Sequence, residues 1–369
     1  MLMDFVQVKA SDDDNGRRLD RILRRYLDGL PLPTLYRSLR AGLVKVNGKK
    51  RDGSYRVQSG DVLALAAFLC PQQCGVATDH DARAGTGDQK PQNASLAVTA
   101  TPACDSVRSA RSQQRYDTTA PIPDEWVLFR GDDVLVLNKP YGIPVQPASK
   151  NDLSALSVLV AIDYALRHGT QTSLAFRPAP LHRLDRRTTG LLVCSQSLAG
   201  AHRFSEMLRY RQLEKHYVAL LCGTLADGGR WHNAIEKRTD ARAFHTVSVA
   251  ADANDDKKCA ITDAMPLAHG KLCARPVTLA QFVIHTGRTH QIRAQAAAHG
   301  FPLLGDTAYG APPLHGFRQA LFLHAMEVRL PPDEETACFL PPLIRAPLPA
   351  AFTEILSAAL IKWDGRLIL

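Results

Sequence analysis

The chain has 369 residues, which is too long for one ordinary core and predicts two domains, or one large domain with a small appendage. Hydrophobic residues make up 45% and charged residues 22%, a globular composition that excludes a wholly disordered or fibrous chain. No apolar run approaches the ~20 residues of a membrane-spanning helix, and the first residues lack the pattern of a secretory signal. Eight scattered cysteines favour free thiols over a disulfide framework, so we expect a cytoplasmic protein that does not enter membranes.

Most of the excess positive charge lies near the start of the chain. Residues 15–57 contain twelve Lys and Arg against three Asp, a net charge of +9 that equals the formal charge of the whole chain. Because these charges belong to a patterned domain and not to a tail, they indicate a phosphate-facing surface with nucleic acid as the partner; a solvated helix face is the alternative. The cations expected to make these contacts are Arg18, Arg21, Arg37, Arg40, Lys45 and Lys49.

The same region carries the pattern of a small α+β domain, which we place at residues 1–69. An apolar stripe at helical spacing predicts a helix over 18–27, and Thr34 is placed to cap a second helix that runs to Leu39. A short strand then ends at the turn signal Asn47-Gly48, and another strand begins after Gly60-Asp61.

Composition changes over residues 70–122. Gln, Ser, Thr, Ala, Asp and Gly dominate there, and large apolar residues nearly vanish. Such a stretch cannot bury enough surface to offset its chain entropy, so we predict a flexible linker, either a mere spacer or a tether for the basic domain.

Order resumes at Trp126, and residues 123–369 form the predicted second domain. Its pattern predicts a mixed α+β body that is rich in strands and lacks regular βαβ alternation. The predicted strands lie at 134–137, 191–195 and 217–222, then at several places up to Ile284, and near 322–328; the predicted helices span 153–167, 201–208 and 291–299.

Asp185 lies in the densest cluster of chemistry-bearing residues, LHRLDRRTTG, directly before a predicted strand. Its neighbours Arg183, Arg186 and Arg187 favour the ionised carboxylate that a nucleophile or a base requires. On charge pattern alone, an ion-paired aspartate that caps a turn is the simpler interpretation. Tyr217 is a further candidate for the site, although a tyrosine in a strand is more often part of a core.

A second cluster, HTGRTHQIR at 285–293, predicts a strand, a glycine turn and a helix start whose donors face a phosphate or a carboxylate. Its histidines, with His299, are spaced five and nine residues apart, which matches no usual zinc site, and Cys70, Cys74 and His80 are equally weak. Neither a phosphate-binding loop, a dinucleotide fingerprint nor a serine-hydrolase elbow occurs in the sequence. We therefore expect no metal, no nucleotide cofactor and no other cofactor.

Several motifs in order resemble the RluA-type pseudouridine synthase family, enzymes that isomerise uridine to pseudouridine in RNA. HRLDRRTTGLLVCSQS at 182–197 is similar to the signature around the family's essential aspartate, NKPYGIPV at 138–145 to its first motif, and HTGRTHQIRAQAAAHGFPLLGDTAYG at 285–310 to its third. The N-terminal GRRLDRILRRYL, LYRSLRAGLVKVNGKKR and VQSGDVLAL are similar to an S4-like RNA-binding domain. The resemblance spans essentially everything except residues 71–123.

The resemblance implies an α+β fold, with a mixed, mostly antiparallel central sheet in the catalytic domain and a small α+β S4-like domain before it. The LPLPTLYRSLRAG segment looks closest to the RluC-like branch, which implies modification of large-subunit (23S) ribosomal RNA at several uridines. Separately, we expect a monomer. Asp185 would be the catalytic aspartate, Tyr217 would lie against the target base, and Arg293 would pair with Asp185. Arg183 would occupy the gap left by the extruded uridine, and His182 and Arg288 would contact RNA nearby.

The implied reaction suits these residues. Breaking the N1–C1′ bond, rotating the base and rejoining it through C5 needs no redox change and no energy input. Asp185 would either attack C1′ or remove the 2′-hydrogen, and the sequence leaves both routes open. Extruding a base costs a few kcal/mol of stacking, and an aromatic face such as Tyr217 returns ~1–3 kcal/mol.

A non-catalytic ribosomal RNA-binding or ribosome-assembly protein on a retired synthase fold is the alternative function. Intact Asp185, Tyr217 and Arg293 argue against it, because a retired site has no reason to keep all three. Departures from the family pattern fall outside this trio and leave the fine positioning of the RNA open; they are Gln146, Arg187, Thr189 and Gln295.

Overall fold

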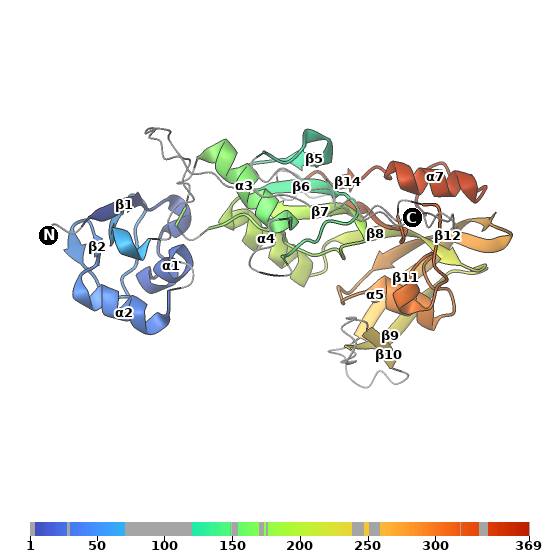
Figure 1. Ribbon diagram of the computed structural model, residues 1–369, viewed down its shortest axis with the longest axis horizontal. Helices are drawn as coiled ribbons and strands as arrows, with labels where there is room; N and C mark the ends of the chain where they lie inside the picture. Colours follow the sequence, from blue (N-terminus) through green and yellow to red (C-terminus); the bar gives the residue numbers. More distant parts are fainter. Residues whose placement is uncertain are drawn as a thin grey trace, which may run out of the picture.

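Two separate β-sheets organise the protein in the computed structural model (Figure 1). One belongs to the N-terminal module, residues 4–70, and the other to the larger body that begins at residue 120. The structure describes residues 4–27, 30–70, 120–147, 149, 154–169, 173–174, 176–237, 247–250, 259–317, 319–331 and 339–368.

The N-terminal module is a four-stranded antiparallel sheet covered by two helices. Its strand order is β1-β4-β2-β3, and the apolar face of α1 packs on the sheet through fully buried Leu19, Ile22 and Leu23. Asn47 and Gly48 both have positive φ values, 51° and 74°, as the predicted turn between β2 and β3 requires. The elements are β1 (Phe5–Lys9), η1 (Asp12–Asp14), α1 (Leu19–Tyr26), α2 (Leu32–Ala41), β2 (Val44–Val46), β3 (Lys49–Lys50), β4 (Val62–Ala66) and η2 (Ala67–Leu69).

The predicted start of the second helix was wrong. Helix α2 begins at Leu32, with Pro31 in the N-cap position, so Thr34 lies inside the first turn and caps nothing. Pro33 is tolerated there because the first amide groups of a helix have no partner within it, and the loss of one N–H is harmless. Strand β1, which pairs with β4 along its whole length, was not predicted.

The body is built on a ten-stranded sheet of order β10-β9-β11-β12-β8-β13-β7-β6-β5, with β14 paired to β13. The β13–β7 pair is parallel and the other pairs are antiparallel, as the mixed, mostly antiparallel expectation requires. The strands are β5 (Val127–Arg130), β6 (Val134–Lys139), β7 (Thr189–Ser195), β8 (Glu214–Cys222), β9 (Gly229–Lys237), β10 (Val247–Ala250), β11 (Cys259–Leu272), β12 (Arg275–Ile284), β13 (Leu323–Arg329) and β14 (Leu343–Arg345).

Helices pack against this sheet and close its apolar cores. Helix α4 starts at a serine cap, because the Ser197 hydroxyl accepts a hydrogen bond from the Gly200 N–H at 2.9 Å. None of the helices in the described ranges is long and apolar enough to cross a membrane. The helices are η3 (Asp124–Trp126), α3 (Leu156–His168), α4 (Leu198–Arg209), α5 (Gln291–Ala298), η5 (Thr307–Tyr309) and α7 (Ala350–Ala358).

A glycine allows the parallel strands β7 and β13 to approach each other closely at the centre of the sheet. Gly190, in β7, has φ +105°, and a Cβ atom there would lie 2.2 Å from the carbonyl oxygen of Ala325 in β13. Only glycine fits this approach. The close β7–β13 contact holds the loop before β7, where Asp185 lies, near β8, which is the next strand beyond β13.

Most of the predicted linker, residues 71–119, lies outside the described residues. Its last part is described, and there Ile122 is buried in the core of the body, with its N–H bonded to fully buried Asp163 at 3.1 Å.

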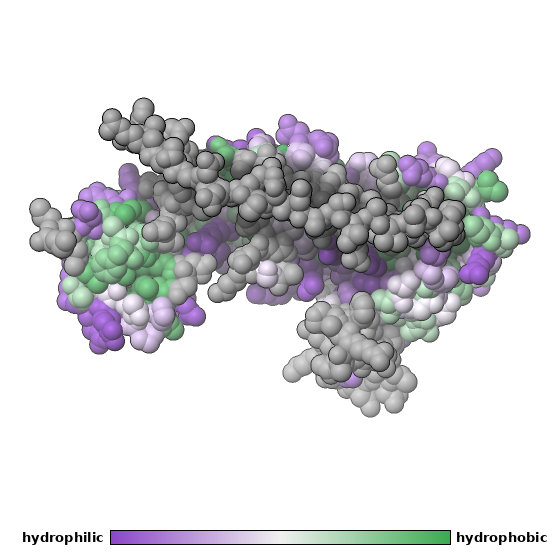
Figure 2. Space-filling model, viewed as in Figure 1, coloured by the Kyte–Doolittle hydropathy of each residue, from purple (hydrophilic) through white to green (hydrophobic). Residues whose placement is uncertain are grey.

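In Figure 2, apolar residues gather on the visible face of the N-terminal module, and hydrophilic residues lie along its upper and lower edges.

Candidate active site

Asp185 lies in the tight turn that precedes β7. The Thr188 N–H donates to the Asp185 carbonyl oxygen at 3.0 Å and closes this turn. The carboxylate side chain is 16% exposed and lines a pocket, so it is partly desolvated but accessible. Its Oδ2 atom lies 3.3 Å from Nη1 of Arg293 and 3.6 Å from Nε2 of His290.

Arg293, on α5, is the cation that faces Asp185, and a second carboxylate fixes its orientation. Its Nε and Nη2 atoms donate to the two oxygens of Asp306 at 2.7 and 2.8 Å, which leaves Nη1 for Asp185. Asp306 is 1% exposed. Burial would lower the pKa of Arg293, but the hydrogen bond and charge of Asp306, together with the charge of Asp185, raise it above its ordinary value, so the guanidinium stays charged.

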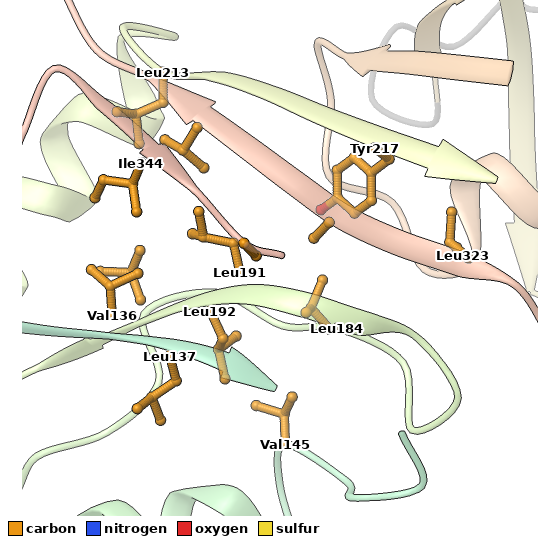
Figure 3. Packing of buried hydrophobic residues seen from close by; sticks show 14 of the residues in the cluster. Val136, Leu137, Val145, Leu184, Leu191, Leu192, Leu213, Tyr217, Leu323 and Ile344 are labelled. Carbon is orange, nitrogen blue, oxygen red and sulfur yellow. The ribbon is translucent and has the colours of Figure 1, made fainter. Parts of the chain in front are cut away.

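Tyr217 reaches the same pocket from β8. Figure 3 shows its ring projecting from the strand among the apolar side chains, with Leu184 and Leu323 labelled nearby. Burial, and secondarily the negative charge of Asp185, raise the pKa of Tyr217, so its hydroxyl stays protonated at neutral pH. Tyr217 therefore belongs to the hydrophobic core and also lines the pocket, so its interpretation as a core residue and its interpretation as a site residue are compatible.

His290 also lines the pocket. The sequence placed it in the 285–293 cluster, whose donors are expected to face a phosphate or a carboxylate, but assigned it no role of its own. It occupies the N-cap position of α5 with φ 52°, a conformation that is uncommon for a non-glycine residue. Its Nδ1 atom lies 2.9 Å from the Tyr309 hydroxyl, and Nε2 faces Asp185. Burial lowers the pKa of His290, and the charge of Asp185 opposes this shift only in part.

Of the residues predicted to contact RNA near the site, Arg183 and Arg288 line the pocket and are exposed. His182 is not in the lining. Its Nε2 atom accepts a hydrogen bond from the Val193 N–H at 3.0 Å, and burial, with the charge of Lys215, lowers the pKa of His182 to about 3. Since a neutral imidazole that already accepts from the backbone is a poor phosphate ligand, this geometry weighs against the predicted RNA contact of His182.

Arg186 does not pair with Asp185, contrary to what the cluster of charges indicated. Its Nε atom donates to the Gly142 carbonyl at 2.8 Å, and the Gly142 N–H returns a bond to the Arg186 carbonyl at 3.0 Å. The fully buried Lys139 ammonium reinforces this contact by donating to the carbonyls of Pro140, Ile143 and Arg186. The loop after β6 and the loop that carries Asp185 are thereby tied together.

The departures Thr189 and Gln295 are absorbed by hydrogen bonds in the core. The Thr189 hydroxyl lies 2.8 Å from Nδ1 of His324, and the amide of Gln295 bonds to Thr262 and to the Trp231 carbonyl. Other histidines of the second cluster are also engaged away from the pocket: His285 contacts Asp263 at 2.7 Å, and His299 stacks on Trp231.

The cations of the N-terminal module lie on its surface, away from this pocket. Arg21, Arg37, Arg40 and Lys49 are exposed. Arg18 forms a bidentate pair with Asp20, at 3.1 and 2.6 Å, and the half-buried Lys45 ammonium lies 4.9 Å from the centre of the Phe5 ring. Of the six cations predicted to contact RNA, four are therefore exposed, and the other two, Arg18 and Lys45, interact with residues of the module.

In chemical terms, the pocket combines an accessible carboxylate, a guanidinium fixed against it and a protonated tyrosine on an apolar wall. Oδ2 of Asp185 faces both Arg293 and His290. A carboxylate held in this way can act as a nucleophile or as a base toward a bound group, and exposed arginines at the rim favour a polyanionic ligand.

Comparison with known families places these residues within recognised segments. Residues 133–298 match the model of the RNA pseudouridylate synthase family, and residues 17–63 match that of the S4 domain. The first match contains Asp185, Tyr217 and Arg293, and the second covers both helices of the N-terminal module.

Curated relatives and solved structures agree with this match. The chain is 27% identical to ribosomal large subunit pseudouridine synthase C of Rickettsia bellii, over 85% of the chain and 89% of that protein. It is 31% identical to ribosomal large subunit pseudouridine synthase D of Pasteurella multocida, over 65% of the chain and 72% of that protein. The structure of human RNA pseudouridylate synthase domain containing 4 shares the fold, with a TM-score of 0.50 at 23% identity, over 65% of this chain and 95% of the human one.

Proposed function

Because the chain belongs to the RNA pseudouridylate synthase family and is a pseudouridine synthase, we propose that it converts uridines of large-subunit (23S) ribosomal RNA to pseudouridine. In this proposal Asp185 is the essential group. Relatives named as ribosomal large subunit synthases, matched over most of their length, support this substrate. The observation that carries the site assignment is the 3.3 Å contact between Asp185 and Arg293 in a pocket that Tyr217 also lines.

Isomerisation breaks the N1–C1′ bond of uridine and forms a C5–C1′ bond. The proton on C5 leaves and N1 gains one, so atoms and charge balance without a further reactant. Asp185 starts the reaction either by attack on C1′ or by removal of the 2′-hydrogen. In both routes Arg293 orients the carboxylate through the 3.3 Å contact, and its own orientation comes from Asp306.

The target base must leave the RNA stack to reach Asp185, which costs a few kcal/mol. In this proposal the Tyr217 ring supports the extruded base, and its hydroxyl stays neutral because burial raises its pKa. The exposed Arg183 enters the gap that the base leaves. Arg288, also exposed at the pocket rim, contacts neighbouring phosphates.

The N-terminal module, residues 1–69 in the proposed division, adds affinity for the RNA backbone through its exposed Arg21, Arg37, Arg40 and Lys49. Residues 123–369 make up the proposed catalytic domain. One chain supplies the whole Asp185, Tyr217 and Arg293 set, which supports action as a monomer. Ribosomal RNA as substrate supports a cytoplasmic location.

The test is the variant Asp185→Asn, which keeps the size of the side chain and removes its charge. We expect pseudouridine formation in large-subunit RNA to fall to background while RNA affinity stays within about threefold, because most binding energy comes from phosphate contacts. Pseudouridine mapping and a filter-binding assay measure the two quantities. Asp364→Asn, at an exposed aspartate, is the matched control. Substantial activity of Asp185→Asn would refute the assigned role.

A further inference from the structure

The N-terminal module is docked on the body through a buried carboxylate, Asp14. This residue is 0% exposed, and its donors come from both parts of the chain. Within the module, the N–H and hydroxyl of Ser11 donate to Oδ2 at 2.9 and 3.0 Å. From the body, the Ser173 hydroxyl donates to Oδ1 at 3.0 Å and the Leu174 N–H to Oδ2 at 3.1 Å. The residues that bond Asp14 from the body are 159 and 160 positions away in the chain.

An apolar contact accompanies this bonding. Leu174 is 7% exposed and belongs to the hydrophobic cluster of the N-terminal module, together with Leu19, Ile22 and Leu27. A leucine of the body thus completes the core of the module. Because separation would return this side chain to water and take two donors from a buried carboxylate, the docked arrangement is favoured.

Two further contacts widen the docking surface beyond Asp14 and Leu174. The Arg177 guanidinium donates to the Arg25 carbonyl at the end of α1, at 3.3 Å. Asp13 lies by the backbone N–H of Leu198, the first residue of α4, which partly offsets the rise in the pKa of Asp13 caused by burial and by the charge of Asp14. Figure 1 shows the module lying beside the end of the body that carries α3 and α4.

We propose that this docking surface, Asp13, Asp14, Leu174 and Arg177, holds the RNA-binding module at a fixed position relative to the Asp185 pocket, so that the enzyme prefers folded RNAs that reach both at once. The inference rests on the proposed function. A fixed module contributes its phosphate contacts only when the RNA spans the correct distance, whereas a freely tethered module would contribute them to RNAs of many shapes. The partner of this surface is therefore the same chain, and the selected substrate is a structured RNA larger than one stem-loop.

Variants on the two sides of the contact test the proposal. Asp14→Ala removes the shared carboxylate, and Leu174→Ala removes the inserted side chain without changing a residue of the module. The matched control is Asp12→Ala, because Asp12 lies in the same turn but bonds Ser59 within the module. Hydrogen exchange at the backbone amide of position 174 and small-angle X-ray scattering of the full chain report the docking. We expect faster exchange and a larger radius of gyration in both docking variants and not in the control.

Activity is then compared on a long large-subunit RNA fragment and on a short stem-loop with the same uridine. We expect the docking variants to lose at least about tenfold in kcat/KM on the long RNA and less than about twofold on the stem-loop. Equal losses on both RNAs, or none on either, would overturn the proposal. If the unmodified enzyme acted on neither RNA, the proposed function would fail. RNA affinity would then decide the docking proposal, because the docking variants should lose at least about tenfold in affinity for the long RNA and less than about twofold for the stem-loop.

Discussion

Asp306 binds two of the three guanidinium nitrogens of Arg293 and leaves the third for Asp185. In Asp306→Asn one acceptor becomes an N–H group that faces the guanidinium, and a buried cation loses its counterion. Since a hydrogen bond to a charged group contributes roughly 1.5–3 kcal/mol, we expect kcat to fall about 10- to 100-fold. Single-turnover kinetics on ribosomal RNA measure this loss, and RNA affinity should change little.

The control for this prediction is Asp263→Asn. Asp263 forms a similar bidentate pair with Arg230, at 2.6 and 2.9 Å, but neither residue lines the pocket. We expect kcat of Asp263→Asn within about threefold of the unmodified enzyme, since this pair lies outside the pocket lining and its arginine is 63% exposed. An Asp306→Asn enzyme with unchanged kcat would show that Arg293 is oriented without Asp306.

At the scale of elements, Lys139 joins the end of β6 to the loop that precedes β7. Lys139→Met keeps the length of the side chain and leaves the carbonyls of Pro140, Ile143 and Arg186 without their shared donor. The Arg186 carbonyl keeps its bond from the Gly142 N–H, so the carbonyls of Pro140 and Ile143 are the two that lose their donor. With about 1–3 kcal/mol for each of them, we expect a loss of about 2–6 kcal/mol in unfolding free energy and a lower kcat. Urea unfolding measures the first, and exposed Lys362→Met, expected within about 0.5 kcal/mol, is its control. Unchanged stability of Lys139→Met would contradict this role.

At the scale of the whole molecule, two histidines whose surroundings lower their pKa predict a stability that falls in mild acid. The pKa of His182 is lowered to about 3 by burial and by the charge of Lys215, and that of His324 to about 4 by burial. As the pH falls below about 6.5, the ordinary pKa of histidine, the unfolded chain binds a proton at each of these positions while the folded chain does not. Each histidine therefore leaves the free energy of unfolding nearly unchanged at pH 7 and lowers it by about 2 kcal/mol at pH 5.

Urea unfolding at pH 7 and pH 5 measures this difference. We expect His324→Gln to reduce it by about 2 kcal/mol, because glutamine does not titrate, whereas the same change at exposed His168 should leave it unaltered. Equal stability of the unmodified protein at the two pH values would contradict the assignment of neutral, buried imidazoles.

Local patterns predicted most helices and strands of the described residues well. The stripe of α1 and the Asn47-Gly48 turn depend on neighbours a few positions away, and such signals are present in any sequence window. The start of α2 and the strand β1 escaped prediction for different reasons. A proline can occupy a first helical turn as well as break a helix, and β1 is a single edge strand whose partner β4 lies over fifty residues away.

The candidate site was only partly predictable. Asp185, Tyr217 and Arg293 were identified through motifs, and they do converge. Asp306 follows Gly305 in the third motif, so its identity was visible, but its bond to Arg293 was not. His290 belongs to the cluster predicted to direct donors at a phosphate or a carboxylate, but the sequence did not indicate that this carboxylate is Asp185.

The amino-acid sequence by itself determined the kinds of element, the basic character of the N-terminal module and the residue types available for chemistry, because these depend on local order and composition. Only the tertiary structure decided which charges meet. Asp185 pairs with Arg293, 108 residues away, and not with Arg186 beside it, and Asp14 binds a leucine amide 160 residues away. Such pairings follow from strand order and from the need to satisfy buried carboxylates, which no local period encodes.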